Sequence, residues 1–218
     1  MPDPSMPEDL LAHALAAKGF MPEDEGELLY RVALRQLPEG PALEVGTYCG
    51  KSAVYLGAAA RETGGTVFTV DHHRGSEENQ VGWEYHDATL ADETSRLDTL
   101  PAFRATIAGA GLEEQVVAVV GRSTTVSALW RTPLSLLFVD GGHTDEHVTN
   151  DYQGWGRWVA RGATLLVHDV FPDPADGGQA PYRIFRRAVD GGDFAETDTL
   201  GSMRVLTRVR GEAGDPVR

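Results

Sequence analysis

The stretch "ALEVGTYCGKSAVYL", residues 42–56, joins an apolar strand, a glycine-rich turn and the start of a helix. The turn ends in the letters GKS, which also end a phosphate-binding P-loop. A P-loop needs four residues between its first glycine and the Gly-Lys pair, but only three separate Gly46 from Gly50. The dinucleotide pattern G-x-G-x-x-G also fails, because Tyr48 stands at its second glycine. Glu44 beside the turn would repel phosphate, so the stretch predicts a site for a ligand with positive charge.

The composition limits the classes of partner. The 218 residues include 33 acids against 19 lysines and arginines, a formal charge of −14, which opposes the counterion release that nucleic-acid binding depends on. The single cysteine excludes an intramolecular disulfide and fits a reducing compartment. The sequence has no run of about eighteen apolar residues, so it predicts no membrane helix. The acidic start "MPDPSMPEDL" does not resemble a signal peptide. We therefore expect a soluble cytoplasmic protein without a nucleic-acid or membrane partner.

Strand and helix patterns alternate along most of the chain. After two helices expected over residues 8–18 and 22–37, strands are expected over 42–46, 66–71, 116–121, 134–140 and 163–169, and helices over 51–62, 100–111, 145–160 and 180–189. Strands that are apolar along nearly their whole length are typical of sheets covered by helices on both faces. The pattern predicts an α/β fold: a doubly wound, mostly parallel sheet of about seven strands, with an antiparallel hairpin at the C-terminal end.

We expect one domain, residues 1–218, with an N-terminal helical extension over 1–39, a core over 40–210 and an insertion over 72–98. The insertion is expected because about forty-four residues connect the second and third strands, too many for one crossover helix. We interpret it as a lid over a substrate. Trp83 and Tyr85 offer flat apolar surface, and His73 offers a hydrogen bond.

In open parallel sheets, ligands bind at the carboxyl ends of the strands. Here those ends carry polar residues, histidines or glycines: Glu44-Val45-Gly46, Asp71-His72-His73, Gly121-Arg122-Ser123, Asp140-Gly141-Gly142-His143 and His168-Asp169. Asp71 can accept hydrogen bonds from both hydroxyls of a ribose. With an acid beside the glycine turn and no phosphate fingerprint, this indicates an adenosine that bears a cationic group. S-adenosylmethionine has that chemistry.

The segments "LEVGTYCGKSAVYLG", "TVD", "LLFVDGGHTDEHVTNDYQGW" and "GATLLVHDV" resemble a class I S-adenosylmethionine-dependent methyltransferase. The chain is most similar to the branch of macrocin-type sugar O-methyltransferases and catechol-type metal-dependent O-methyltransferases, over about residues 40–190. The resemblance implies a Rossmann-like methyltransferase fold. It places the methionine part of the cofactor at the glycine turn, the ribose at Asp71 and the adenine at Arg122 and Ser123. The implied cofactor-binding residues are Glu44, Gly46, Thr47, Tyr48, Gly50, Ser52, Asp71, His72, Gly121, Arg122, Ser123, Asp140 and Gly141.

The resemblance also implies catalytic groups. In metal-dependent relatives, the positions matching Asp140, His168 and Asp169 hold one divalent cation. His168 departs from the oxygen-only pattern that Mg²⁺ prefers, which leaves open two cases: no metal, or a softer ion such as Mn²⁺, Fe²⁺ or Zn²⁺. His143 matches a histidine proposed as general base, with Asp140 as its catalytic neighbour.

The expected activity is methyl transfer from S-adenosylmethionine to a hydroxyl of a small molecule, such as a sugar, a natural product or a phenol. An alcohol is preferred because it needs help to lose its proton. Four alternatives stay open: N-methylation, carboxyl methylation, a metal-dependent hydroxylase-like protein and a non-catalytic binding module on the same fold. Assembly as a homodimer is also open.

Overall fold

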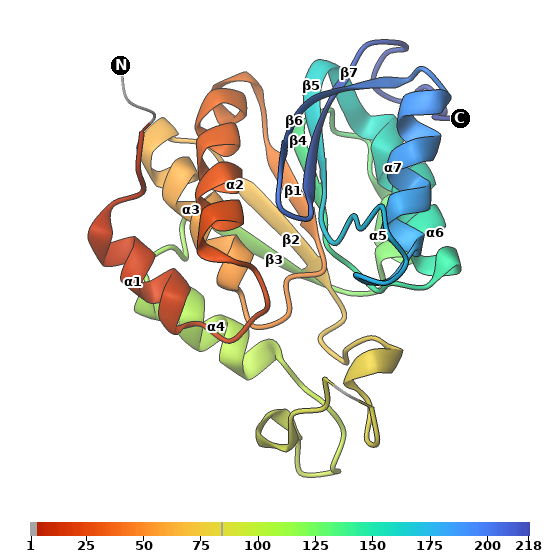
Figure 1. Ribbon diagram of the computed structural model, residues 1–218. Coiled ribbons are helices and arrows are strands. Elements are labelled where there is room, and N and C mark those ends of the chain that lie inside the picture. The colour runs from red at the N-terminus through yellow and green to blue at the C-terminus, as the bar shows by residue number, and fades with distance from the viewer. Residues whose placement is uncertain (1–3, 84) are drawn as a thin grey trace.

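The core of the protein is a sheet of seven strands: β1 (Ala42–Val45), β2 (Val67–Asp71), β3 (Val116–Val120), β4 (Leu134–Val139), β5 (Val159–Val167), β6 (Phe194–Leu200) and β7 (Met203–Arg208). The computed structural model describes residues 4–83 and 85–218. The strand order is β3-β2-β1-β4-β5-β7-β6 (Figure 1). The first five strands pair in parallel, and β7 runs antiparallel to both β5 and β6. The predicted mostly parallel sheet with a C-terminal hairpin is confirmed.

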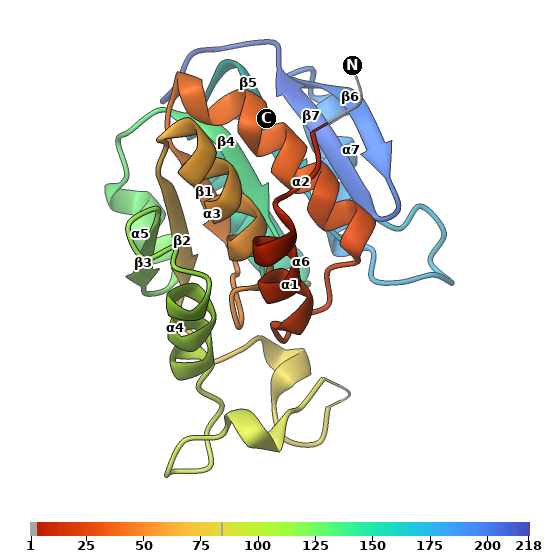
Figure 2. The ribbon, with the colours of Figure 1, turned by 90° about the vertical axis from the view of Figure 1, so that its left-hand side faces the viewer.

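Helices cover both faces of this sheet. One apolar cluster joins the sheet to α1 (Glu8–Ala16), α2 (Glu23–Gln36), α3 (Lys51–Thr63) and α4 (Leu100–Gly109). The other joins it to α5 (Ser123–Leu129), α6 (Asp145–Trp155) and α7 (Ala180–Asp190). Figure 2 shows α1, α2 and α3 in front of the strands. The doubly wound arrangement follows from strands that are apolar on both faces. Among the described residues, no helix has the length and apolar character needed to cross a membrane.

Two elements differ from the predicted ranges. The helix expected over residues 145–160 ends at Trp155, and β5 already begins at Val159 after a short 3-10 turn. Buried Arg208 explains why the helix stops before β5, because its guanidinium donates to the carbonyls of Arg157 at 2.8 Å and Val159 at 2.7 Å.

The helix α5 was not predicted from the sequence. Its residues, STTVSAL, are mostly β-branched or hydroxylic and have low helix propensity, so packing against the sheet decides its structure.

The insertion over residues 72–98 extends from the carboxyl edge of the sheet, as the yellow segment of Figure 1 shows. Arg74 closes its base. Its guanidinium donates to Asp92 Oδ2 at 2.7 Å and to the Leu97 carbonyl at 3.1 Å. Leu97 also packs with Leu90 and Cys49 in a small buried cluster. These contacts hold the insertion beside the glycine turn that follows β1.

Candidate active site

A cavity of about 1130 Å³ lies at the carboxyl ends of β1 to β5, where the fold predicts a ligand. The N-terminal segment 18–21 and the insertion add to its walls. The cavity brings together most of the predicted site residues: Gly46, Thr47, Tyr48, Ser52, Asp71, His72, Tyr85, Gly121, Arg122, Ser123, Asp140, Gly141, His143, His168 and Asp169. Four others do not line it: Glu44, Gly50, His73 and Trp83.

The glycine turn after β1 is bonded to the end of β2. Asp71 Oδ2 accepts from the backbone N–H groups of Thr47 and Tyr48, both at 3.0 Å, and Oδ1 accepts from the His73 N–H at 2.7 Å. A carboxylate offers roughly four acceptor positions, so Asp71 keeps acceptor capacity toward the cavity. The same carboxylate therefore fixes the turn and faces the cavity.

Gly46 allows the turn to approach the end of β4. Its φ is +83°, and a Cβ built there would lie 2.3 Å from the Asp140 carbonyl oxygen. No side chain fits this gap, because real Cβ atoms do not come so close. Asp140 is thus brought directly beside the glycine turn.

Glu44 lies behind the turn rather than in the cavity. Its side chain is fully buried, and the Ser52 hydroxyl donates to it. Burial, only partly offset by the hydrogen bond from Ser52, raises the pKa of Glu44 to about 8. Glu44 therefore holds Ser52, which does line the cavity, and does not itself face it.

Two predicted substrate contacts also lie outside the cavity. His73 is buried, and its Nδ1 lies 2.8 Å from Thr99 Oγ1. Trp83 is 54% exposed at the far part of the insertion. Of the predicted substrate side chains, Tyr85 alone lines the cavity.

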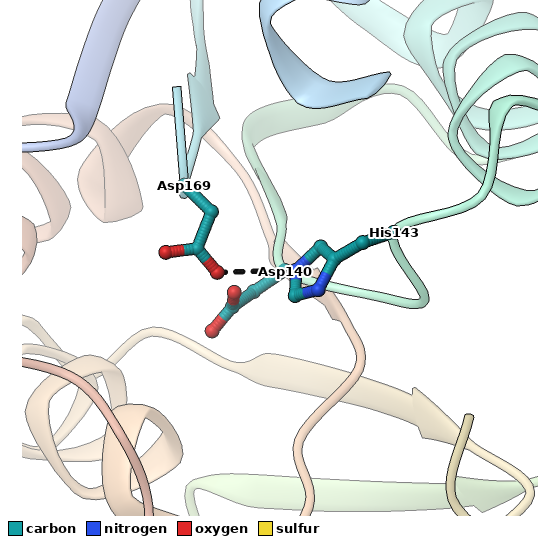
Figure 3. Close-up of side chains that lie close together, drawn as sticks. All are labelled: Asp140, His143 and Asp169. Carbon is teal, nitrogen blue, oxygen red and sulfur yellow. Dashed lines mark ion pairs between the residues drawn. The ribbon is translucent and has the colours of Figure 1, made fainter. Parts of the chain in front are cut away.

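Asp140, His143 and Asp169 come together from β4, the loop after it and the end of β5 (Figure 3). One ligand atom from each lies within 4.8 Å of the others, and His143 Nε2 is 3.1 Å from Asp169 Oδ2. This is the group in the described part of the chain that can share a metal ion. It differs from the predicted set, because His143 takes the place of His168.

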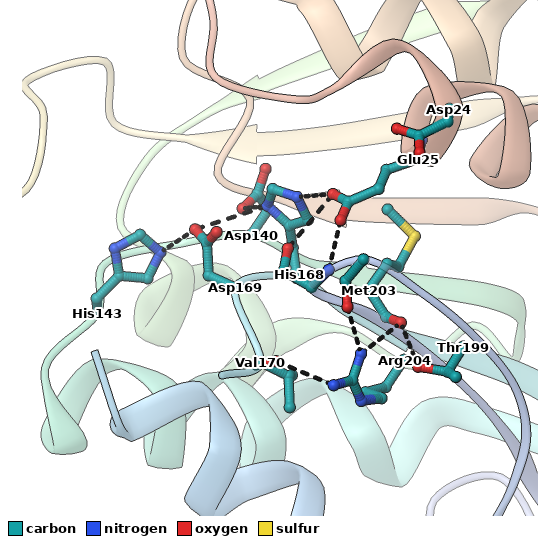
Figure 4. Close-up of polar contacts among 12 residues, drawn as sticks. Asp24, Glu25, Asp140, His143, His168, Asp169, Val170, Thr199, Met203 and Arg204 are labelled. Carbon is teal, nitrogen blue, oxygen red and sulfur yellow. Dashed lines mark hydrogen bonds and ion pairs between the residues drawn. The ribbon is translucent and has the colours of Figure 1, made fainter. Parts of the chain in front are cut away.

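His168 has no nitrogen left for a metal (Figure 4). Its Nδ1 lies 2.9 Å from Asp140 Oδ1 and its Nε2 lies 2.6 Å from Glu25 Oε2. Burial disfavours the charged ring, but the charge and hydrogen bond of Asp140 and the hydrogen bond of Glu25 outweigh it and raise the pKa of His168 to about 11. The raised pKa favours the imidazolium form of His168, in which Nδ1 donates to Asp140 and orients it.

His143 is held between two carboxylates. Its Nδ1 lies 3.1 Å from Glu78 Oε1, on the insertion, while its Nε2 faces Asp169. Burial opposes the charge, but Asp169, Glu78 and Asp140 outweigh it and raise the pKa of His143 to about 9. Sequence reasoning missed both Glu78 and Glu25. Each is one acid among many in its segment, and only the fold brings it to a histidine.

Aromatic side chains form one rim of the cavity. The ring of Phe20 lies 5.8 Å from that of Tyr48 and 5.2 Å from that of Tyr85, between centroids. Beside them, Lys18 Nζ lies 2.5 Å from Asp87 Oδ2. The N-terminal segment and the insertion thus meet at the cavity. Sequence reasoning missed Phe20.

Solved structures share this fold. A cofactor-bound protein from MTB, Rv0187, is 20% identical with a TM-score of 0.67, over 94% of this chain and 92% of that chain. The O-methyltransferase TomG from Streptomyces achromogenes, solved with SAM, is 19% identical with a TM-score of 0.61, over 94% and 91%. An O-methyltransferase from Bacillus cereus in complex with SAH is 17% identical with a TM-score of 0.62, over 93% and 92%.

The sequence itself carries the family assignment. A family profile described as "Methyltransferase domain" matches residues 43–170, which run from β1 past the end of β5. The matched range contains the glycine turn, Asp71, Asp140, His143 and Asp169. Because the match spans more than half of the 218 residues, the protein belongs to this family of methyltransferases.

Proposed function

We propose that the protein transfers the methyl group of S-adenosylmethionine to a hydroxyl of a small molecule. The observation that carries this proposal is one cavity that joins two sets of groups. The glycine turn and Asp71 suit the cofactor, and Asp140, His143 and Asp169 suit an acceptor that must lose a proton. TomG, which shares the fold, is described as an O-methyltransferase with SAM bound.

Methyl transfer from a sulfonium is an in-line displacement with a good leaving group, so the protein mainly aligns the acceptor and removes its proton. In our proposal the neutral form of His143, which becomes more abundant as the pH approaches the raised pKa of about 9, turns Nε2 from Asp169 to the acceptor hydroxyl and takes its proton. Glu78 holds the other ring nitrogen and so orients the ring. The N-terminal segment and the insertion exclude water around the reacting atoms.

The donor set also fits a divalent metal. Two carboxylates and one imidazole suit Mn²⁺ or Fe²⁺ better than Mg²⁺, which prefers oxygen alone. Bound there, such an ion would supply a Lewis acid that lowers the pKa of an alcohol. Asp140, His143 and Asp169 would hold it, in which case His143 would be a ligand and not the base, and His168 with Glu25 would keep the Asp140 carboxylate in place.

Incubation with S-adenosylmethionine and a panel of sugars, phenols and hydroxylated natural products tests the proposal, with products identified by mass spectrometry. We expect S-adenosylhomocysteine and one product heavier by one methyl group on oxygen. Methylation of an amine or carboxylate would replace the O-methyl assignment, and oxygen consumption with bound iron would favour a hydroxylase. Binding without transfer to any acceptor would favour a binding module. The acceptor, a homodimer and a cytoplasmic location stay predictions.

A further inference from the structure

A buried carboxyl group that is not one of Asp140, His143 and Asp169 also lines the cavity. Asp151, on α6, is 5% exposed and lines the cavity. The Ser123 hydroxyl donates to Asp151 Oδ1, and Trp155 Nε1 donates to the Ser123 oxygen at 2.7 Å. This chain of hydrogen bonds fixes the carboxyl group between α5 and α6.

The second oxygen of Asp151 lies at the wall formed by Gly141. A Cβ built on Gly141 would be 3.0 Å from Asp151 Oδ2, so only the absence of a side chain leaves that oxygen room. Within the described part of the chain, no lysine or arginine pairs with Asp151, and the nearby His147 ring favours its ionised form. Oδ2 accepts none of the hydrogen bonds found among these residues. Since Asp151 lines the cavity, a ligand that enters there can supply the donor that Oδ2 lacks.

We infer that Asp151, held by Ser123, binds the exocyclic amino group of the cofactor's adenine and selects against a base that carries oxygen there. The inference rests on the proposed function, since it takes S-adenosylmethionine as the cofactor. If Asp71 holds the ribose at the end of β2, the base extends toward the neighbouring wall, made by Gly121, Ser123 and Gly141. An ionised carboxylate accepts hydrogen bonds but cannot donate them. It therefore attracts an amino group and repels a carbonyl oxygen.

Calorimetric binding of two ligands tests this. S-adenosylhomocysteine carries the amino group, and S-inosylhomocysteine carries a carbonyl oxygen in its place. Titrations at pH 8 keep Asp151 ionised, because burial raises its pKa only to about 6. We expect the adenosyl ligand to bind about tenfold to a hundredfold more tightly, as for one hydrogen bond to a charged group. Equal affinities would overturn the inference and leave the proposed function standing. If neither ligand bound, both would fall.

Asp151→Asn supplies the matched variant, because an amide of the same shape can also donate to the carbonyl oxygen. We expect it to reduce the preference to about threefold or less, with Ser123 and Trp155 still in place. Asp145→Asn makes the same change on the same helix, at an exposed residue that pairs with Arg183 outside the cavity, and should keep the full preference. An Asp151→Asn protein that is folded and keeps the full preference would assign Asp151 a purely structural role. Equal affinities in the wild type would overturn the inference even if the variant did not fold.

Discussion

Glu25 and His168 are separated by 143 positions in the sequence, yet Glu25 Oε2 lies 2.6 Å from His168 Nε2. Glu25 also accepts from the backbone N–H of Ser202 at 2.5 Å. It therefore joins α2, the end of β5 and the turn between β6 and β7 beneath the candidate active site (Figure 4). The N-terminal helices are thus bonded to the residue that orients Asp140.

Glu25→Ala should destabilise the protein strongly, because it leaves Nε2 of the buried His168 ring without its carboxylate partner. Removing one partner of a buried ion pair costs about 3–5 kcal/mol. Urea unfolding followed by circular dichroism measures the change. Glu23→Ala, at an exposed acid in the same helical turn, should cost less than about 1 kcal/mol. Equal losses in the two variants would mean that the Glu25–His168 contact adds no stability.

The sequence predicted those site residues that follow directly from strand ends. Asp71, Asp140 and Asp169 each close a parallel strand, and parallel strands of one sheet end at one edge, so their convergence follows from the order of elements alone. The predicted fold is confirmed for the same reason, since apolar strands alternating with amphipathic helices leave few other arrangements.

The exchange of His143 for His168 could not be predicted in this way. Both histidines lie at strand ends, and only the position of Glu25 shows that His168 has its two nitrogens occupied. Phe20 and Glu78 were missed for a related reason. Phe20 lies in a loop and Glu78 in a short 3-10 turn of the insertion, where contacts depend on how two loops meet and not on a period of two or 3.6 residues.

Glu44 should make stability depend on pH. Its pKa is about 8 in the folded protein and near 4.5 when unfolded, so between these values the folded state binds a proton that the unfolded state has released. Rising pH therefore favours unfolding across this window. In the wild type, the unfolding free energy should fall between pH 5 and pH 8. Glu44→Gln should make this fall smaller by on the order of a few kcal/mol. Chemical denaturation at each pH measures it.

The control for Glu44 is Glu39→Gln, at an exposed residue in the 3-10 turn before β1. It should keep the wild-type slope, since the other titrating groups are unchanged. A Glu44→Gln protein with the same slope as wild type would show that Glu44 is ionised in the folded state.

Tyr85 and Trp83 should behave differently although they are two positions apart. Tyr85 lines the cavity and packs edge-on against Phe20, whereas Trp83 is 54% exposed and does not line it. Tyr85→Ala should raise the acceptor KM or lower kcat, while the affinity for S-adenosylhomocysteine stays within about threefold. Trp83→Ala should leave both nearly unchanged. Steady-state kinetics with the identified acceptor and calorimetry with the cofactor product measure these effects. The reverse ranking would place the acceptor against Trp83.

Mn²⁺ binding should depend on His143 and not on its exposed neighbour His147. His143 converges with Asp140 and Asp169, whereas the His147 ring bonds Thr144 at 2.9 Å. Titration of chelator-treated protein with Mn²⁺, followed by electron paramagnetic resonance of the free ion, should show one bound ion in the wild type. His143→Ala and Asp169→Asn should each weaken it by about tenfold or more, since each removes one of three ligands. His147→Ala should bind Mn²⁺ as the wild type does.

An unchanged Mn²⁺ affinity in His143→Ala would remove that imidazole from the ligand set. Absence of any bound Mn²⁺ in the wild type would leave His143 and Asp169 as acid–base groups without a metal.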